Sequence, residues 1–430
     1  MNERQVMEYM EQVSAYGIVP GLDSIRELCR ELGDPQKELR FVHIAGTNGK
    51  GSVSAFLAEI LKCAGYRVGR YLSPTLFQYR ERIQVNGICI TKAALGRGVE
   101  RIKGICDGMV ARGLPHPTPF EIETALGFLY FSEKAGDVVV LETGMGGLLD
   151  ATNIVENTLA AVLTSVSMDH MQFLGDTPEK IAFQKAGIIK RGCRVVSAVQ
   201  RKEVMEVIRA GAEAMGCPLQ AVKPEMLSQV RYGLEKQSFD YGGLKKLELS
   251  LAGKYQIENA ALAVETVEAL REQGLSVSEE AVRLGLLRTQ WPGRFTLIGK
   301  KPYFIVDGAH NEEAAVRLAE SLEFYFTNKR VIYIMGVLKD KEYEKIIAST
   351  HALADQIITV TPPGNPRALP AYELARAVAE VHCDVTAADS LEEAVEMSRL
   401  LAGKEDVIVA FGSLSFLGRL MEIAGYGKVS

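Results

Sequence analysis

The sequence predicts an α/β protein in two parts: an N-terminal phosphate-loop ATPase-like domain with a mostly parallel sheet (residues 1–296), and a smaller C-terminal Rossmann-like α/β domain (residues 297–430). Three observations predict this fold. An apolar run at 41–44 leads through a glycine-rich turn into a helical pattern at 53–64. Apolar strands then alternate with helical patterns as far as residue 199. The alternation, which is typical of parallel sheets, restarts with strands at 303–306, 331–335, 356–360 and 407–411.

The composition is that of an ordinary globular protein, and it narrows the range of partners. The 430 residues are too many for one hydrophobic core, and 47% of them are apolar. The formal net charge is −5, so there is no basic excess to neutralise nucleic-acid phosphates, and we expect no nucleic-acid partner. No apolar run approaches the roughly 20 residues that span a bilayer, and the charged N-terminus has no signal-peptide core. We therefore expect no membrane partner.

The seven cysteines are scattered without the Cys-x-x-Cys spacing of zinc sites. This pattern favours neither a zinc site nor a disulfide framework. Cysteines of this kind are typical of proteins in a reducing compartment, so we expect a cytoplasmic location.

The glycine-rich turn 46–52, GTNGKGS, joins the first strand to a helix that is expected to stop at Gly65. Glycines let backbone N–H groups converge, and the positive end of the helix dipole favours an anion there. Lys50 would reach the terminal phosphates of a nucleotide, and the Ser52 hydroxyl would hold magnesium. The strict Walker pattern fails because Gly51 stands between Lys50 and Ser52, so a turn without a ligand is the alternative.

The second strand, 66–72, ends at Ser73, ahead of a loop at 75–82 and a hairpin strand at 83–87. Open α/β sheets bind ligands in the loops that follow the C-terminal ends of their strands. Ser73 is therefore a candidate ligand, and Arg80 or Arg82 is a candidate for binding an acidic substrate. A solvated surface is the alternative for both arginines.

Glu142 ends a fully apolar strand, 137–142, and a glycine-rich loop follows it. In a phosphate-loop fold this strand tip is where a magnesium-binding acid belongs, across from Ser52. Upstream, residues 118–121 open a helix, in which Glu121 could be no more than a first-turn carboxylate that suits the helix dipole.

Two histidines, His170 and His310, lie just past a strand tip beside an aspartate, whereas His43 is expected to be a core residue. Imidazole is an unusual magnesium ligand, so the residue pattern alone leaves the role of His170 open. On the following helix, at 178–187, Lys185 is expected to be solvated by default. A strand at 193–199 is predicted to close the parallel series.

The remaining segments are predicted helices and strands that turns separate. Residues 1–40 are predicted to form two helices broken at Tyr16–Gly21. Alternation at 245–251 predicts a half-buried strand, and a long helix opens nearby, with Asn259 in its first turn as a site residue or simply a cap. The turn Trp291–Arg294 is interpreted as the hinge between the domains, with the polar strand tip 307–311 facing it.

Six segments together carry a family signature. They are GTNGKGS, LETGMGGLLDATN, SMDHMQFLG, KAGIIK, WPGR and DGAHN, in this order and at these spacings. From about residue 20 to the C-terminus, the chain resembles the folylpolyglutamate synthase/dihydrofolate synthase family of the Mur-ligase superfamily. The set is specific, although each segment alone would be a weak signal.

The resemblance implies a ligase that binds ATP between its two domains. Two domains that close on one active site need no partner chain, so we expect a monomer. Such an enzyme phosphorylates a carboxylate of folate or dihydropteroate, and L-glutamate attacks the acyl phosphate. The C-terminal domain would close over the nucleotide and bind glutamate. Two Mg²⁺ ions are implied, and a monovalent cation such as K⁺ is compatible with the family.

The resemblance also assigns site residues. The phosphate loop would comprise Gly46, Thr47, Asn48, Gly49, Lys50, Gly51 and Ser52, and the other nucleotide contacts would be Asn259, Arg294, Asp307 and His310. Ser52 and Glu142 would hold one magnesium, and Ser73 and His170 the second, with help from a carbamylated Lys185. Lys50, Glu142, His170 and Lys185 would be the catalytic set. The pterin-side pocket would comprise Thr118, Pro119, Phe120, Glu121, Leu149, Asp150 and Ala151, with Arg82 as a further substrate contact.

Two positions depart from the family pattern. Leu148 stands where the family usually has arginine, and Thr75 where it usually has histidine. Both lie near the pterin and second-metal region, so they bear on pterin affinity and on the dihydropteroate reaction. The alternatives are a Mur-type amino-acid ligase acting on a cell-wall precursor, and a phosphate-loop ATPase that makes no small-molecule product.

Overall fold

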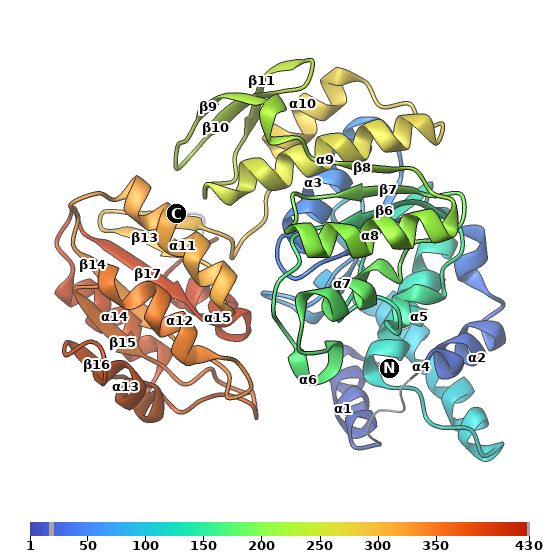
Figure 1. Ribbon diagram of the computed structural model, residues 1–430. Coiled ribbons are helices and arrows are strands. Elements are labelled where there is room, and N and C mark those ends of the chain that lie inside the picture. The colour runs from blue at the N-terminus through green and yellow to red at the C-terminus, as the bar shows by residue number, and fades with distance from the viewer. Residues whose placement is uncertain (17–20, 428–430) are drawn as a thin grey trace. The chain divides into compact units, whose positions relative to one another are not determined.

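The computed structural model describes residues 1–16 and 21–427, so most of the turn predicted at Tyr16–Gly21 lies outside the described residues. Contacts divide the chain into two compact units (Figure 1). The first unit comprises Met1–Leu227, Tyr241–Leu244 and Asn259–Arg288, and the second Ser228–Asp240, Lys245–Glu258 and Thr289–Ser430. The contacts thus group most of 228–258 with the C-terminal part, whereas the sequence boundary at 296 placed these residues in the N-terminal domain.

The described strands of the first unit form one twisted, mostly parallel sheet. They are β1 (Phe41–Ala45), β2 (Val68–Tyr71), β3 (Ile83–Val85), β4 (Ile88–Cys89), β5 (Val138–Glu142), β6 (Thr158–Leu163), β7 (Arg194–Ser197) and β8 (Leu219–Ala221). Their order is β4-β3-β2-β5-β1-β6-β7-β8, and only β3 and β4 run antiparallel to their neighbours. The central strands β1 and β5 are buried throughout, as expected for continuous apolar runs covered on both faces.

The prediction that the strand at 193–199 closes the parallel series is wrong. The short strand β8 pairs in parallel with β7 beyond it. Its three residues, Leu219, Gln220 and Ala221, are all only partly buried, so no apolar run marked it in the sequence.

Helices cover both faces of this sheet (Figure 1). The helices of this unit are α1 (Glu3–Ser14), α2 (Asp23–Glu31), α3 (Lys50–Cys63), α4 (Lys92–Ala111), α5 (Pro119–Glu133), α6 (Met171–Leu174), α7 (Pro178–Ala186), α8 (Lys202–Met215) and α10 (Glu279–Arg288), together with α9 (Tyr255–Glu272), which begins in the second unit. Phe41, Tyr71, Val139 and Leu141 join a core with α1, α2, α4 and α5. Because side chains alternate along a strand, the neighbouring residues face the opposite side, where α3 packs on β1, β2 and β5. In turn α10 packs on α3, so closely that a Cβ atom on Gly285 would lie 2.5 Å from the Ile60 Cα.

The second unit contains its own sheet. The strands predicted at 303–306, 331–335 and 407–411 have the predicted bounds. The strands are β12 (Thr296–Lys300), β13 (Tyr303–Val306), β14 (Val331–Met335), β15 (Gln356–Thr359), β16 (Val385–Ala387) and β17 (Val407–Phe411), in the order β12-β13-β17-β14-β15-β16. All pairs are parallel except β12–β13. The helices are α11 (Glu312–Tyr325), α12 (Tyr343–Thr350), α13 (Ala371–Ala379), α14 (Leu391–Leu401) and α15 (Leu414–Ile423). One core joins α11, α12 and α13 to the strands, and α14 packs with α15.

A small sheet, ordered β11-β10-β9, precedes α9. Its strands are β9 (Leu227–Arg231), β10 (Gln237–Tyr241) and β11 (Leu244–Leu249). The strand predicted at 245–251 is thus confirmed as β11, one residue earlier at its start.

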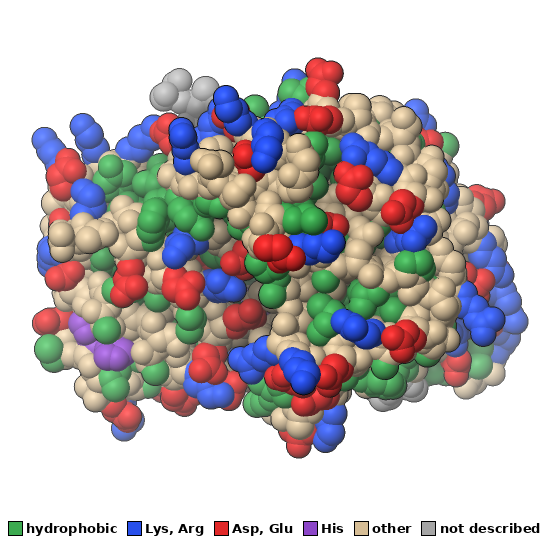
Figure 2. All heavy atoms as spheres, turned by 45° about the horizontal axis from the view of Figure 1, so that its top comes forward, with side chains coloured by type: hydrophobic (Ala, Val, Ile, Leu, Met, Phe, Trp, Pro, Cys, Tyr) green, Lys and Arg blue, Asp and Glu red, His purple; other side chains and the backbone are tan. Residues whose placement is uncertain are grey.

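The surface shows no segregation of charge on the face in Figure 2, where lysine and arginine side chains alternate with aspartate and glutamate. In the part of the chain that the structure describes, no helix has the length and apolar character needed to cross a membrane. All seven cysteines lie in this part, and each is a free thiol.

Candidate active site

Four neighbouring strands of the first unit bring the predicted site segments to one edge of the sheet. The strands β2, β5, β1 and β6 are adjacent and parallel, and Ile44 at the end of β1 pairs with Glu142 and with Val162. The C-terminal ends of parallel strands meet at the same edge. Ser73, Glu142, the phosphate loop and residues 164–170 therefore lie side by side, although the sequence separates them widely.

The phosphate loop approaches its neighbours so closely that two of its residues must be glycine. Gly49 has φ +87°, and a Cβ atom there would lie 2.6 Å from the Asn259 Oδ1. A Cβ atom on Gly46 would lie 1.7 Å from the Thr164 Oγ1. Asn259 sits in the second turn of α9, so it does not cap this helix. Its amide lies against the phosphate loop, as the nucleotide-contact hypothesis requires.

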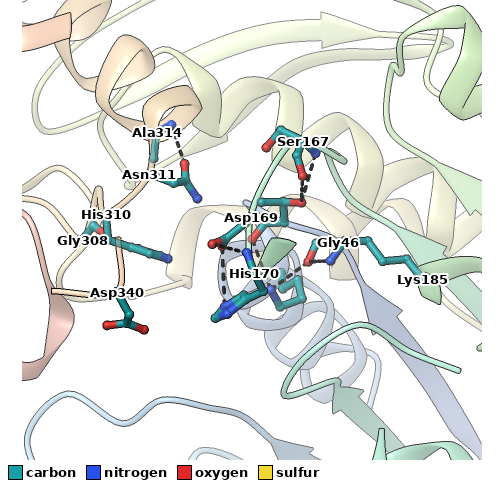
Figure 3. A network of polar contacts seen from close by, with 12 residues as sticks. Gly46, Ser167, Asp169, His170, Lys185, Gly308, His310, Asn311, Ala314 and Asp340 are labelled. Atoms are coloured by element: carbon teal, nitrogen blue, oxygen red, sulfur yellow. Dashed lines mark hydrogen bonds and ion pairs between the residues drawn. The ribbon is translucent and has the colours of Figure 1, made fainter. Parts of the chain in front are cut away.

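Hydrogen bonds tie the phosphate loop to the segment that follows β6. The Thr47 N–H donates to the Ser165 carbonyl (2.6 Å), and the Thr47 hydroxyl donates to the Ser167 carbonyl (3.0 Å). The Ser167 N–H in turn donates to the Thr47 Oγ1 at 3.0 Å (Figure 3). These bonds fix the position of residues 167–170 relative to the loop.

Two lysines converge on one carbonyl of the loop. The Lys185 Nζ donates to the Gly46 oxygen at 2.8 Å (Figure 3), and the Lys50 Nζ donates to the same oxygen at 2.9 Å. Lys185 is only 4% exposed, so the expectation of a solvated side chain is wrong. Burial, together with the charge of Lys50, lowers the pKa of Lys185 to about 7, although Asp169 and Asp150 act in the opposite direction. The amine is therefore poised between its charged and neutral forms near neutral pH.

Glu142 and Ser52 offer oxygen ligands on the same side of the sheet. Both are buried, Glu142 at the end of β5 and Ser52 in the first turn of α3, which packs over β5. Hydroxyl and carboxylate oxygens are the ligands that Mg²⁺ prefers, so this pair fits a magnesium ion. Among the described residues, no cluster of three or more His, Cys, Asp or Glu side chains could hold a metal. A magnesium ion here would take its remaining ligands from phosphates and water.

His170 begins the short helix α6 with a left-handed backbone, φ +49°. Its ring Nε2 lies 3.7 Å from the Asp169 Oδ2, and its backbone N–H donates to the Asp169 Oδ1 at 2.9 Å (Figure 3). The half-buried Ser73 follows β2. The assignment of a second magnesium to Ser73 and His170 stays a prediction.

Phe120, in the first segment of the predicted pterin-side pocket, packs against the start of the loop that follows β5. A Cβ atom on Gly144 would lie 2.6 Å from the Phe120 Cζ. Thr118 and Glu121 form a capping box at the start of α5, with the Thr118 N–H donating to the Glu121 carboxylate at 2.7 Å. Glu121 thus lies in the first turn, as expected, and its contact with the pterin stays a prediction. Pro119 occupies the first turn beside them.

The loop after β5 is organised by Asp150. Its carboxylate accepts hydrogen bonds from the Met145 N–H (2.9 Å) and the Thr152 N–H (3.0 Å), and burial raises its pKa. Ala151 is buried, whereas Leu149 is 55% exposed. In this loop Leu149 thus has the side chain most accessible to a substrate.

Arg82 is neither solvated nor directed at the phosphate loop. Its Nη1 lies 3.3 Å from the Glu123 Oε2, and both side chains are largely buried. The charges of Arg82 and Glu123 compensate each other. Contact between Arg82 and an acidic substrate stays a prediction. His43, as expected, lies in the core, where its Nε2 is 2.9 Å from the Thr152 Oγ1.

The predicted site residues of the second unit gather at the tip of β13. The Asp307 carboxylate accepts from the Tyr255 hydroxyl (2.6 Å) and from the Phe295 N–H (2.7 Å) and the Ala309 N–H (2.8 Å). The Arg294 guanidinium packs on Gly308, where an added Cβ atom would lie 2.1 Å from its Nη1.

His310 continues this loop. Its Nδ1 lies 2.8 Å from the Gly308 carbonyl (Figure 3). Arg294, Asp307 and His310 therefore form one local arrangement, as the prediction of a shared role requires.

Sequence reasoning missed two charged residues near the phosphate loop. Asp169 interacts with Lys185, and the buried Arg70 donates to the first turns of α3. The available signal for Arg70 was a charged residue in the middle of a predicted strand. The signal for Asp169 was its position beside His170, past a strand tip.

Comparison with known proteins covers nearly the whole chain. Residues 44–267 match the family model for the Mur ligase middle domain, and residues 293–414 match that for the Mur ligase, glutamate ligase domain. The dihydrofolate synthase/folylpolyglutamate synthase of Bacillus subtilis is 37% identical over 94% of each chain.

Two solved structures share the fold over nearly their whole lengths. Mycobacterium tuberculosis folylpolyglutamate synthase complexed with ADP and AMPPCP has a TM-score of 0.91 and 31% identity, with 98% of each chain covered. The Escherichia coli enzyme in complex with DHPP and ADP has a TM-score of 0.84 and 31% identity over 97% of each chain.

Proposed function

This chain belongs to the folylpolyglutamate synthase/dihydrofolate synthase family of the Mur ligases, and we propose that it uses ATP to join L-glutamate to folate, or to dihydropteroate, through an acyl phosphate. One observation of the structure supports this proposal most strongly. The phosphate loop, Glu142 and Lys185 come from three separate segments and gather at one edge of the sheet. Two relatives with the same fold bind adenine nucleotides.

In the proposed reaction, a carboxylate oxygen of the folate substrate attacks the γ-phosphorus of ATP, and ADP leaves. The α-amine of glutamate then attacks the acyl carbon, and phosphate departs with the former carboxylate oxygen. Little covalent chemistry falls to the protein, because phosphoryl transfer depends mainly on positioning and charge stabilisation.

The chain supplies these two contributions from the phosphate loop. Backbone N–H groups of residues 46–52 and the positive end of α3 attract the triphosphate. Lys50, whose ammonium lies over the loop on the Gly46 and Thr47 carbonyls, neutralises the terminal phosphates. Ser52 and Glu142 would hold a magnesium ion, which when bound neutralises the phosphate charge.

Lys185 is proposed to act as a carbamate. Its lowered pKa leaves a large fraction of the side chain as a neutral amine at neutral pH, and only this form adds to CO₂, with release of a proton. The product is an anion, which a nearby Mg²⁺ attracts, whereas it would repel an ammonium. A second magnesium, held by Ser73 and His170 beside this carbamate, and a bound K⁺ are parts of the same proposal.

The remaining assignments concern substrates and partners. Thr118–Glu121, Leu149–Ala151 and Arg82 are proposed to bind the pterin side of the substrate, and Asn259, Arg294, Asp307 and His310 to contact the nucleotide. We also propose a cytoplasmic monomer without nucleic-acid or membrane partners. The relatives disfavour a cell-wall precursor as substrate, and they disfavour an ATPase without a ligation product.

Whether tetrahydrofolate or dihydropteroate is the better substrate depends on the residues that are proposed to bind the pterin. The Leu148 N–H donates to the Gln184 carbonyl at 2.7 Å, and a Cβ atom on Gly187 would lie 2.6 Å from the Leu148 Cβ. The apolar Leu148 side chain therefore packs against the end of α7 and offers no hydrogen-bond donor to a pterin. We expect tetrahydrofolate to be the better substrate and dihydropteroate the weaker one.

The test incubates the enzyme with Mg-ATP and L-glutamate, adding tetrahydrofolate, dihydropteroate or neither, and measures ADP together with the glutamylated product by mass spectrometry. ADP release should require both the pterin and glutamate. Lys50→Met should abolish it, whereas Lys62→Met, on the exposed last turn of the same helix, should not. ADP release that ignores the pterin and glutamate would refute the proposal.

A further inference from the structure

Arg70 is a buried charge that the proposed chemistry leaves without a role. It lies inside β2, is 8% exposed, and pairs in register with Val140 of the neighbouring β5. A guanidinium in such a place is strongly unfavourable unless hydrogen bonds and an opposite charge compensate it. If Arg70 only filled space between the sheet and its helices, an apolar side chain would serve as well.

The hydrogen bonds of Arg70 go to the stretch of α3 that carries Ser52. Its Nε donates to the Ser54 Oγ at 3.0 Å, and its Nη2 donates to the Gly51 carbonyl at 3.1 Å. A cation near the N-terminus of a helix opposes the helix dipole. For the stability of α3 alone, the charge of Arg70 is therefore misplaced, and its benefit must lie elsewhere.

The compensating charge is Glu142. Residues that pair in a parallel sheet point to the same face, so Arg70 and Val140 share a face with Glu142, two residues further along β5. Burial lowers the pKa of Arg70 to about 10, and Glu142 opposes this shift, so the guanidinium stays charged at neutral pH. Arg70 thus connects the two oxygen ligands assigned to magnesium: it attracts the Glu142 carboxylate and binds the backbone beside Ser52.

We propose that Arg70 is a positioning residue for the nucleotide site, which holds the Glu142 carboxylate and the Ser52 turn of α3 so that both oxygens face one magnesium ion. Arg70 itself contacts neither the nucleotide nor the metal. This inference rests on the proposed function, because it takes Ser52 and Glu142 as the magnesium ligands.

The test measures binding of the non-hydrolysable nucleotide AMPPCP by calorimetry, with and without Mg²⁺, in the intact chain. Arg70→Met should weaken binding by about tenfold or more in the presence of Mg²⁺, and much less in its absence. Arg70→Lys should recover part of the affinity, since it keeps the charge but cannot reach both acceptors. Ser54→Ala, which removes one acceptor, should fall between wild type and Arg70→Met.

The control is Arg67→Met, the same substitution at an exposed position just before β2, which should bind as wild type does. If Arg70→Met lowers only the melting temperature, or if it tightens Mg²⁺-dependent binding, the inference is wrong. If Arg70→Met does not fold, the same comparison applies to Arg70→Lys and Ser54→Ala, whose unchanged Mg²⁺ dependence would also refute it.

These outcomes are separable from those of the proposed function. A wild-type chain that binds Mg-AMPPCP in an Arg70-dependent manner but forms no glutamate conjugate would refute the ligase proposal and leave this one standing. A wild-type chain that does not bind Mg-AMPPCP would refute both.

Discussion

The phosphate-loop edge of the first unit and the Asp307 loop of the second both bury a charged side chain, but they compensate its charge differently. Asp307 accepts three hydrogen bonds of 2.6–2.8 Å from its own unit. Lys185 is buried beside a second ammonium, that of Lys50, and both donate to the Gly46 carbonyl.

The difference distinguishes a preformed scaffold from a site prepared for a ligand. The Asp307 loop is stabilised by its own hydrogen bonds, so its geometry does not depend on a nucleotide. The phosphate-loop edge concentrates positive charge, which an anionic ligand would relieve. Substitutions at the phosphate-loop edge should therefore above all reduce activity. Substitutions in the Asp307 loop should above all lower the stability of the fold.

The largest expected effect is that of Glu142→Gln, which keeps the shape of the side chain and removes its charge. Ligation should fall at least ~100-fold, because the carboxylate assigned to magnesium is lost, while the chain stays folded. Steady-state kinetics and circular dichroism measure the two properties. Glu133→Gln, at the exposed end of α5, is the matched control. Wild-type turnover in Glu142→Gln would remove this residue from the mechanism.

Lys185→Met should abolish ligation and yet stabilise the unliganded fold. Because the folded-state pKa of Lys185, about 7, lies below its ordinary value of 10.5, the wild-type chain loses stability as the pH falls from 10.5 towards 7. The variant escapes this loss, so its advantage should reach a few kcal/mol near neutral pH and shrink as the pH approaches 10.5. Urea unfolding in CO₂-free buffers across this range measures it. A variant less stable than wild type at neutral pH would contradict the account in which burial of the Lys185 amine costs stability.

Asp307→Asn should destabilise the second unit by about 2 kcal/mol, because an amide replaces a carboxylate that accepts two backbone bonds and a hydroxyl bond. Denaturant unfolding followed by a probe in this unit reports the change. Exposed Asp340 provides the control substitution, Asp340→Asn. Stability equal to that of wild type would show that Asp307 is not the structural anchor described here.

Tyr255→Phe should have the smallest effect, about 1 kcal/mol, since it removes one of the three donors to Asp307. The double variant with Asp307→Asn should be destabilised by less than the sum of the two single changes, because both remove the same bond. Strict additivity in this double-mutant cycle would mean that the Tyr255–Asp307 contact contributes nothing.

How far the sequence predicts this molecule depends on the element. The runs at 303–306, 331–335 and 407–411 are continuous and apolar, and the structure has these strands with the same bounds. The helix α4 was not predicted, because four glycines interrupt it, and glycine is a poor helix former. Tertiary packing explains its composition, since a Cβ atom on Gly98 would lie 2.3 Å from the Leu126 Cδ1.

In the candidate site, too, the sequence predicts the positions of some residues and not of others. The position of Glu142 beside the phosphate loop follows from a carboxylate at the tip of an apolar strand. The burial of Lys185 does not follow from its helix, because nothing local shows that α7 turns this residue towards Gly46. The contact of Arg70 with α3 is likewise a property of the assembled sheet, and no pattern within β2 specifies it.

The most direct test of the central claim follows an oxygen atom. A folate substrate labelled with ¹⁸O in the reacting carboxylate is incubated with Mg-ATP and L-glutamate, and the released phosphate is analysed by mass spectrometry. If the carboxylate is activated as an acyl phosphate, one labelled oxygen should appear in each phosphate released. Unlabelled phosphate, formed alongside glutamylated product, would contradict this account.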